Sequence, residues 1–260
     1  CDHSCTFCVI PSCRGDSQSE SVDNINKNIF FHLENGVKEI ILTGVDLTSW
    51  TEGNITNKKL GDLLEKIFIK NRSDFRLRLS SIDAAEIDDK LLDLIKNEPR
   101  LMPHFHFSLQ SLDDLILKRM KRRHNVRDIY QLFDKIRNVS KNVTFGADFI
   151  CGFPTEDEKM FLNTYRRVKD LNITHLHVFP YSAKKGTPAS RMPQVDLPLR
   201  RERAKLLRKL GIENFTTEII KQINKKKNIL VETDNGFGRT ENNFKILVKN
   251  GKKGSLLAKT

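Results

Sequence analysis

The cysteines at the start of the chain, Cys1, Cys5 and Cys8, stand at a spacing that suits a metal cluster. They place three thiolates within one short loop. A cubane iron–sulfur cluster usually takes four thiolates, one for each iron. With three, one iron keeps an open coordination position where a further molecule can bind. The spacing therefore predicts a [4Fe–4S] cluster on Cys1, Cys5 and Cys8 that takes part in chemistry.

Two other interpretations of these thiols stay open. His3 lies among the cysteines, and zinc also accepts three cysteines and one histidine, although no second Cys-x2-Cys pair follows. Structural thiols are the other alternative, but the chain has five cysteines, an odd number, and no recognisable signal peptide, which disfavours a disulfide framework. We expect Cys13 and Cys151 not to be ligands, because Cys13 breaks the tight spacing and Cys151 is remote.

Alternating strand-like and helix-like segments must position this loop. Such alternation predicts an α/β fold with parallel strands and crossover helices. The expected strands are Val37–Thr43, Phe75–Ser80, Phe105–Leu109, Val143–Ile150 and His175–Pro180. The expected helices are Val22–Asn35, Lys59–Lys70, Ile87–Asn97, Asp113–Met120, Val126–Val139, Glu156–Leu171 and Leu199–Lys221. After the last helix, Asn228–Glu232 and Phe244–Val248 predict a small β module, so we divide the chain into residues 1–224 and 225–260.

Polar residues or glycines follow every predicted strand of the larger part. In parallel barrels the active site forms at the carboxyl ends of the strands, so these residues should face one mouth beside the cysteines. They suit a cofactor that presents amino, carboxylate, ribose and adenine groups. The strand ends are Thr43–Asp46, Ser80–Asp83, Ser108–Ser111, Asp148 with Cys151–Pro154, and Phe179–Ser182.

Several longer motifs make the chain resemble a known family. The cysteine motif continues as Cys-Thr-Phe-Cys-Val-Ile-Pro to Arg14 and Gly15. This segment is similar to the methylthiotransferase branch of the radical S-adenosylmethionine (SAM) enzymes. Within that branch, the sequence resembles the tRNA enzymes that act on N6-threonylcarbamoyladenosine. The motifs that carry this resemblance are LTGVDLTS (42–49), RLRLSSID (76–83), HFSLQ (106–110), LILKRMKRRH (115–124), FGADFICGFPTE (145–156) and THLHVFPYSAKKGTPASRMP (174–193).

The resemblance implies a partial (β/α) barrel, a [4Fe–4S] cluster and SAM. One SAM would yield the 5′-deoxyadenosyl radical that removes hydrogen from C2 of adenosine 37, beside the tRNA anticodon. A second SAM would donate a methyl group to a sulfur at an auxiliary [4Fe–4S] cluster. No side chain is assigned an acid–base role, because the cofactors carry the hard step. An electron donor such as flavodoxin or ferredoxin is expected as a further partner.

The expected SAM-binding residues lie in the loop, at the strand ends and in the basic segment 118–124. Arg119 enters only through the resemblance, which places it toward the SAM carboxylate. The full set is Phe7, Thr43, Gly44, Val45, Ser81, Ser108, Gln110, Arg119, Asp148 and Phe179.

The chain also departs from the family pattern. It starts at Cys1 rather than Met, and we expect a fragment that lacks the first barrel strand and the N-terminal domain, which would hold the auxiliary cluster. Leu112 follows Ser111 where the family usually has glycine. The C-terminal segment, residues 225–260, resembles an RNA-binding TRAM module but is short.

The charge balance points to a polyanionic partner. Formal net charge is +12, and we expect tRNA to be bound through its phosphates, near the anticodon loop. Alternatively, the basic clusters are only solvated faces of helices. Tyr181 and Phe237 either stack on bases of the RNA or pack within the protein. No apolar run is long enough to cross a bilayer, and free cysteines suit a reducing cytoplasm. The candidate RNA-binding residues are Lys118, Lys121, Arg122, Arg123, Lys225, Lys226 and Lys227.

Alternative functions remain at this stage. Two belong to the same family: a methylthiotransferase for isopentenyladenosine in tRNA, and one for a ribosomal protein. The third is not an enzyme: a zinc-stabilised RNA-binding module. A reconstituted iron–sulfur protein absorbs visible light, whereas a zinc protein is colourless, and this difference separates the enzymes from the binding module.

Overall fold

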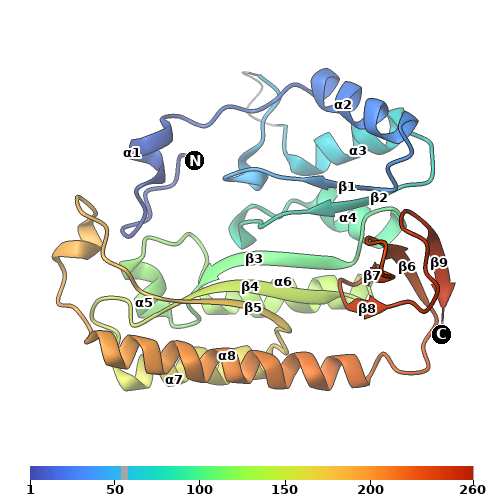
Figure 1. Ribbon diagram of the computed structural model, residues 1–260. Helices are drawn as coiled ribbons and strands as arrows, with labels where there is room; N and C mark the ends of the chain where they lie inside the picture. The colour runs from blue at the N-terminus through green and yellow to red at the C-terminus, as the bar shows by residue number, and fades with distance from the viewer. Residues whose placement is uncertain (54–57, 260) are drawn as a thin grey trace.

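A single curved layer of parallel strands organises the computed structural model, which describes residues 1–53 and 58–259 (Figure 1). Isolated parallel bridges, Leu77 to Leu101 and Ile82 to Phe107, join a two-stranded sheet to a three-stranded one. The result is half of a barrel. Its strands are β1 (Glu39–Leu42), β2 (Arg76–Leu79), β3 (His104–Gln110), β4 (Thr144–Cys151) and β5 (His175–Pro180).

Helices cover the outer face of this half-barrel and bury its apolar side chains. Alternate residues of the strands, such as Phe105 and Phe107 of β3, enter the core beneath the helices. Side-chain caps start the helices at defined residues: Asp113, Asn125 and Asp157 each accept a backbone N–H of the first turn. The helices are α1 (Ile10–Arg14), α2 (Val22–Glu34), α3 (Leu60–Lys70), α4 (Asp89–Asn97), α5 (Asp114–Arg119), α6 (Val126–Val139), α7 (Glu158–Asp170) and α8 (Leu197–Ile220).

A small antiparallel sheet lies at the amino ends of the barrel strands, opposite the N-terminal loop (Figure 1). Arg76 and Arg78 of β2 donate to the carbonyl oxygen of Thr240, at 2.9 and 2.8 Å, and both pair with Glu39 of β1. These buried contacts tie the small sheet to the inner face of the half-barrel. Its strands, in the order β8-β7-β6-β9, are β6 (Lys227–Val231), β7 (Phe237–Thr240), β8 (Lys245–Leu247) and β9 (Leu256–Lys259).

The predicted fold class is confirmed, including the C-terminal sheet. Observed ends differ from the expected ones by a few residues, as for β1, which is shorter than Val37–Thr43. Helix α1 and strands β7 and β9 were not predicted. The predicted division at residue 225 falls between α8 and β6. Within the described residues, no helix is both long and apolar enough to cross a membrane.

Candidate active site

The cysteine loop (residues 1–9) is fastened to the mouth of the half-barrel, at the carboxyl ends of the strands, by its residue Thr6. The Thr6 backbone N–H donates to the Met120 carbonyl at 3.2 Å, and its hydroxyl donates to the Arg119 carbonyl at 2.8 Å. The Ala189 N–H donates to the Thr6 carbonyl at 2.9 Å. Thr6 is buried, so the loop is held between two segments far apart in the sequence.

Phe7 anchors the same loop through apolar packing. Its ring meets Phe153 edge to face, with centroids 6.4 Å apart, and Phe153 meets Tyr181 in the same way at 5.6 Å. These rings belong to a small apolar cluster that also contains Ile116 and Met120 and is separate from the main core. The aromatic residue between Cys5 and Cys8 thus has a structural role that fixes the thiols near the mouth.

Each predicted cluster ligand has a free thiol and at least one close polar neighbour. Cys1 Sγ lies 3.5 Å from Asp46 Oδ2, Arg122 Nη1 donates to Cys5 Sγ at 3.5 Å, and the Ile10 N–H donates to Cys8 Sγ at 3.4 Å. Burial alone would raise the pKa of Cys5, but hydrogen bonds from His3 and Arg122 outweigh it and lower that pKa. A thiolate at Cys5 is therefore favoured, and three thiols in one anchored loop fit an iron–sulfur cluster.

The other cysteines lie in different surroundings. Cys13 is an exposed residue of α1, and Cys151 is buried at the end of β4. Burial, reinforced by Glu156, raises the pKa of the Cys151 thiol far above its ordinary value. A thiol that stays protonated is a poor metal ligand. The prediction that neither residue is a ligand agrees with these positions and stays a prediction.

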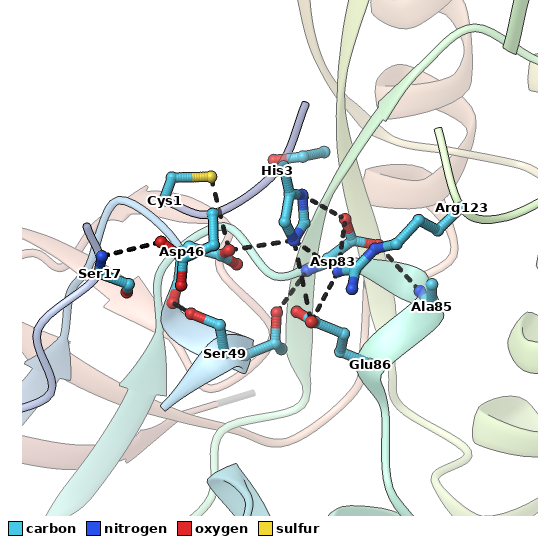
Figure 2. Close-up of polar contacts among 12 residues, drawn as sticks. Cys1, His3, Ser17, Asp46, Ser49, Asp83, Ala85, Glu86 and Arg123 are labelled. Atoms are coloured by element: carbon cyan, nitrogen blue, oxygen red, sulfur yellow. Dashed lines mark hydrogen bonds and ion pairs between the residues drawn. The ribbon is translucent and has the colours of Figure 1, made fainter. Parts of the chain in front are cut away.

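A network of ionised groups surrounds the loop at the ends of β1 and β2 (Figure 2). The His3 ring lies 3.1 Å from Asp46, 3.5 Å from Asp83 and 3.8 Å from Glu86. Hydrogen bonds to Cys5 and Glu86, helped by Asp46, raise the pKa of His3 to about 9 despite its partial burial. Arg123 pairs with Glu86 at 2.6 Å. His3 therefore links the loop to three carboxylates of the mouth.

Arg122 is placed differently from its expected role in RNA binding. Its side chain is only 5 % exposed, and its Nη2 donates to Asp83 at 2.8 Å and to the Ser108 carbonyl at 2.7 Å. A guanidinium held inside the mouth does not reach phosphates, so we reassign Arg122 to the support of the loop. Lys118 and Lys121 are exposed beside it.

Lys227, which was also expected to bind RNA, is not at the surface. It is buried in β6 with its ammonium 3.7 Å from Glu241, whereas Lys225 and Lys226 are exposed. Burial lowers the pKa of Lys227, although Glu241 opposes this. Lys227 thus supports the fold of the small sheet, and its expected RNA contact is not favoured.

The expected SAM-binding residues divide between two cavities beside the cysteine loop. One, of about 360 Å³, is lined by Phe7, Gln110, Asp148, Phe179 and other residues of the β4 and β5 ends. The other, of about 440 Å³, is lined by Thr43, Gly44 and Val45, together with Cys1. The structure thus brings seven of the ten expected residues to the mouth, in two groups of four and three.

The remaining three expected SAM contacts line neither cavity. Arg119 donates to the Thr155 carbonyl at 3.2 Å and approaches Met160, so its guanidinium is engaged with the start of α7. The Ser108 carbonyl accepts from Arg122. Ser81 is half-buried between β2 and the next turn. Arg119 is therefore not directed to a SAM carboxylate in this structure.

Sequence reasoning missed a set of histidines on the inner face. His104 and His106 alternate along β3, and His175 and His177 alternate along β5, with Asp148 between them on β4. The signal was the His-x-His pattern, present twice in strands of one sheet. Residues two positions apart along a strand point to the same face of the sheet.

The Radical SAM superfamily pattern matches residues 1–168, more than half of the chain. The chain belongs to the radical SAM superfamily. Membership implies a [4Fe–4S] cluster and SAM, and the anchored thiols of Cys1, Cys5 and Cys8 are the donors that fit the cluster. The zinc-module alternative is thereby disfavoured, although Cys1, His3 and Asp46 offer ligand atoms within 4.8 Å of one another.

Curated relatives narrow the similarity within the radical SAM superfamily. The chain is 44 % identical to "Threonylcarbamoyladenosine tRNA methylthiotransferase MtaB" of Rickettsia prowazekii, over 93 % of this chain and 57 % of the relative. The Bacillus subtilis protein of the same name is 31 % identical over 96 % of this chain and 57 % of the relative. A "tRNA-2-methylthio-N(6)-dimethylallyladenosine synthase" of Bartonella henselae is 34 % identical over 89 % of this chain and 51 % of the relative. The chain thus spans a little over half the length of these relatives, and the resemblance drawn from its motifs is confirmed.

Solved radical SAM structures share the fold at low sequence identity. The coproporphyrinogen III oxidase HemN of Escherichia coli superimposes with a TM-score of 0.55 at 15 % identity, over 95 % of this chain and 59 % of HemN. The methyltransferase TsrM of Kitasatospora setae gives a TM-score of 0.58 at 14 % identity, over 73 % of this chain and 37 % of TsrM. These likenesses concern the fold alone.

Proposed function

We propose that this chain is the radical SAM part of a methylthiotransferase that modifies C2 of N6-threonylcarbamoyladenosine at position 37 of tRNA. The observation that carries the proposal is the identity of 44 % to an MtaB protein along 93 % of the chain. The cysteine loop anchored at the mouth supports it. When bound, the cluster and SAM supply the one-electron chemistry that an unactivated aromatic C–H bond requires.

The residues of the chain hold these groups and keep the mouth in shape. Thr6 and Phe7 fix the loop, while Arg122 donates to Cys5 and thereby favours its thiolate. The cavity lined by Gln110 and Asp148 offers polar atoms beside apolar walls, a combination that suits a nucleoside. We assign SAM to this cavity because it joins the polar side chains of Gln110 and Asp148 to the aromatic rings of Phe7 and Phe179.

We further propose that tRNA approaches the mouth over exposed lysines. Lys118 and Lys121 lie beside the cysteine loop, and Lys225 and Lys226 lie near the small C-terminal sheet. The α5 cations would hold phosphates of an anticodon loop whose adenosine leaves its stack, and the cations at the opposite end would hold a more distant part of the tRNA. An external one-electron donor, such as flavodoxin or ferredoxin, is part of this proposal.

A second [4Fe–4S] cluster is also proposed, held by residues outside the 260 of this sequence. The transferred sulfur needs a carrier, and in the described part of the chain Cys13 and Cys151 lie apart, one exposed and one buried. The relatives extend well beyond the matched region. The isolated chain should therefore yield no methylthio-nucleoside, and mass spectrometry of digested tRNA checks this. Its formation would contradict the two-cluster proposal.

The choice of substrate is tested by binding of three anticodon stem-loops. They are identical except at position 37, which carries threonylcarbamoyladenosine, isopentenyladenosine or adenosine. The proposal expects the tightest binding, by fluorescence anisotropy with iron-loaded protein, for the threonylcarbamoyl form. Tighter binding of the isopentenyl form would instead favour the function named for the Bartonella henselae relative, and equal binding would contradict the proposed choice of substrate.

A further inference from the structure

Three side chains converge on the inner face of the half-barrel, and one of them, Asp148, lines the same cavity as Phe7 of the cysteine loop. They are His106 of β3, Asp148 of β4 and His177 of β5. Asp148 Oδ1 lies 2.9 Å from His106 Nε2 and 3.1 Å from His177 Nδ1. One potential ligand atom from each of the three residues lies within 4.8 Å of the other two.

The sheet itself builds this arrangement. Asp148 stands opposite His177 in the β4–β5 register, and Gly146 stands opposite His106 in the β3–β4 register. A Cβ on Gly146 would lie 2.3 Å from His106 Nδ1. A side chain at position 146 would therefore clash with the His106 ring. With glycine there, the ring can lie over β4 and reach Asp148.

The two separations that involve Asp148 match those expected between ligands of one metal ion. Nitrogen and oxygen ligands bind first-row divalent ions at about 2.0–2.2 Å. At right angles, two such ligands lie roughly 3 Å apart, which is the separation of Asp148 from each imidazole. Two histidines and one carboxylate on one side of an ion form the facial triad, a set that leaves other coordination positions open.

We propose that His106, Asp148 and His177 bind one divalent first-row transition-metal ion, of the Zn²⁺ or Fe²⁺ class, separate from the iron–sulfur cluster. The His177 side chain is 63 % exposed, so the site is accessible from solvent. Asp148 also lines the cavity that contains Gln110 and Phe179. Open positions of the ion would thus be available to an oxygen ligand of a molecule in that cavity. This inference does not depend on which substrate the enzyme modifies.

The experiment uses tag-free chain in which Cys1, Cys5 and Cys8 are replaced by Ser, so that neither a cluster nor the Cys1–His3–Asp46 group competes. After removal of metals with a chelator, the protein is titrated with Co²⁺, whose visible bands report coordination by nitrogen and oxygen. Zn²⁺ content after dialysis is measured in parallel. We expect one ion per chain in both measurements.

The decisive variant is His177→Ala, because this exposed residue contributes little to packing. Loss of an outer-shell partner alone costs about 10–100-fold in metal affinity, so loss of a direct ligand should weaken binding at least tenfold. His106→Gln should do the same. His32→Ala, at an exposed histidine of α2, is the matched control and should bind as the parent does.

Circular dichroism confirms that each variant is folded before titration. The proposal is overturned if the parent binds well below one ion per chain. It is overturned equally if His177→Ala keeps the parent's affinity. In both cases the three residues form only a hydrogen-bonded network, in which Asp148 accepts from the two imidazoles.

Discussion

At the scale of single residues, the cysteine loop depends on a few directed contacts rather than on extensive packing. Thr6 joins it to two distant segments, and Phe7 inserts into a small apolar cluster. His3 ties it to Asp46, Asp83 and Glu86. The geometry of the thiols is therefore set by neighbours that the spacing of the cysteines does not reveal.

Replacement of any one of Cys1, Cys5 or Cys8 by Ala should abolish cluster binding, because two thiolates cannot hold a cubane that needs three. The matched control is Cys13→Ala, at an exposed position of α1, which should load iron as the parent does. Iron and sulfide per chain are measured after anaerobic reconstitution. Loss of iron in the Cys13 variant would show that the ligands are wrongly assigned.

Arg122→Met should destabilise the fold by roughly 1.5–3 kcal/mol, since it removes one charged hydrogen-bond partner of a buried carboxylate, Asp83, which keeps the Ala85 N–H and His3. Lys121→Met, at the exposed neighbour, should change the free energy of unfolding by no more than about 0.5 kcal/mol. Urea unfolding of the protein without cluster gives both values. Similar values for the two variants would mean that Arg122 is not the internal cation described here.

At the scale of elements, helix α5 and the turn after it divide the basic segment between two roles. Arg122 turns into the mouth, whereas Lys118 and Lys121 face solvent. Lys121 has a positive φ of 57°, so the chain reverses at this residue and sends adjacent side chains in different directions. A run of basic residues in the sequence could not show this division.

The double variant Lys118→Glu, Lys121→Glu should weaken tRNA binding and flatten its dependence on salt. For every phosphate that the variant no longer neutralises, the slope of log K against log salt should fall by roughly 0.7–0.9. Anisotropy titrations at several salt concentrations measure the slope. Lys159→Glu with Lys169→Glu, on α7, makes the same charge change elsewhere. If the salt dependence of the Lys118→Glu, Lys121→Glu variant equals that of the parent, α5 is not part of the tRNA interface.

The sequence predicts most elements of the half-barrel, because its strands are apolar runs and its helices begin at Asp or Asn caps. It also identifies the cysteine loop, since three thiols at close spacing have few other uses. The small sheet was harder: Phe237–Thr240 and Leu256–Lys259 are short strands, in polar or glycine-containing surroundings, that pair only in the folded chain. Buried cations such as Arg122 and Lys227 were assigned to the surface, because a sequence shows charge but not its partner.

At the scale of the whole molecule, the two ends of the half-barrel have different tasks. The carboxyl ends carry the cysteine loop and both cavities at the mouth, whereas the amino ends are closed by the C-terminal sheet (Figure 1). Histidines occur at the closed end as well. His175 contacts Phe215 and Phe244, and its ring centroid lies 4.6 Å from that of His104.

These two histidines should make attachment of the C-terminal sheet sensitive to acid. Burial lowers the pKa of His175 to about 4, and burial together with His175 lowers the pKa of His104 as well. A histidine whose pKa is lower in the folded state than its unfolded value of about 6.5 binds its proton more readily in the unfolded chain. Its contribution to folding stability is therefore complete above about pH 6.5 and is lost as the pH falls toward 4. For His175 the loss should be on the order of 2–3 kcal/mol.

His175→Phe keeps an aromatic ring between Phe215 and Phe244 but cannot be protonated. The difference in unfolding free energy between pH 7 and pH 5 should therefore be smaller in this variant than in the parent. Urea unfolding at both pH values gives the comparison, with His32→Phe as control at an exposed site. An identical pH dependence in parent and His175→Phe would contradict the assignment.

The central claim is that the loop of Cys1, Cys5 and Cys8 holds a cluster that activates SAM at this mouth. The most direct test is to incubate the iron-loaded chain with dithionite and SAM and to quantify 5′-deoxyadenosine by mass spectrometry. The account predicts 5′-deoxyadenosine that depends on dithionite, is absent from Cys5→Ala and persists in Cys13→Ala. Its absence from folded, fully iron-loaded protein would contradict the account.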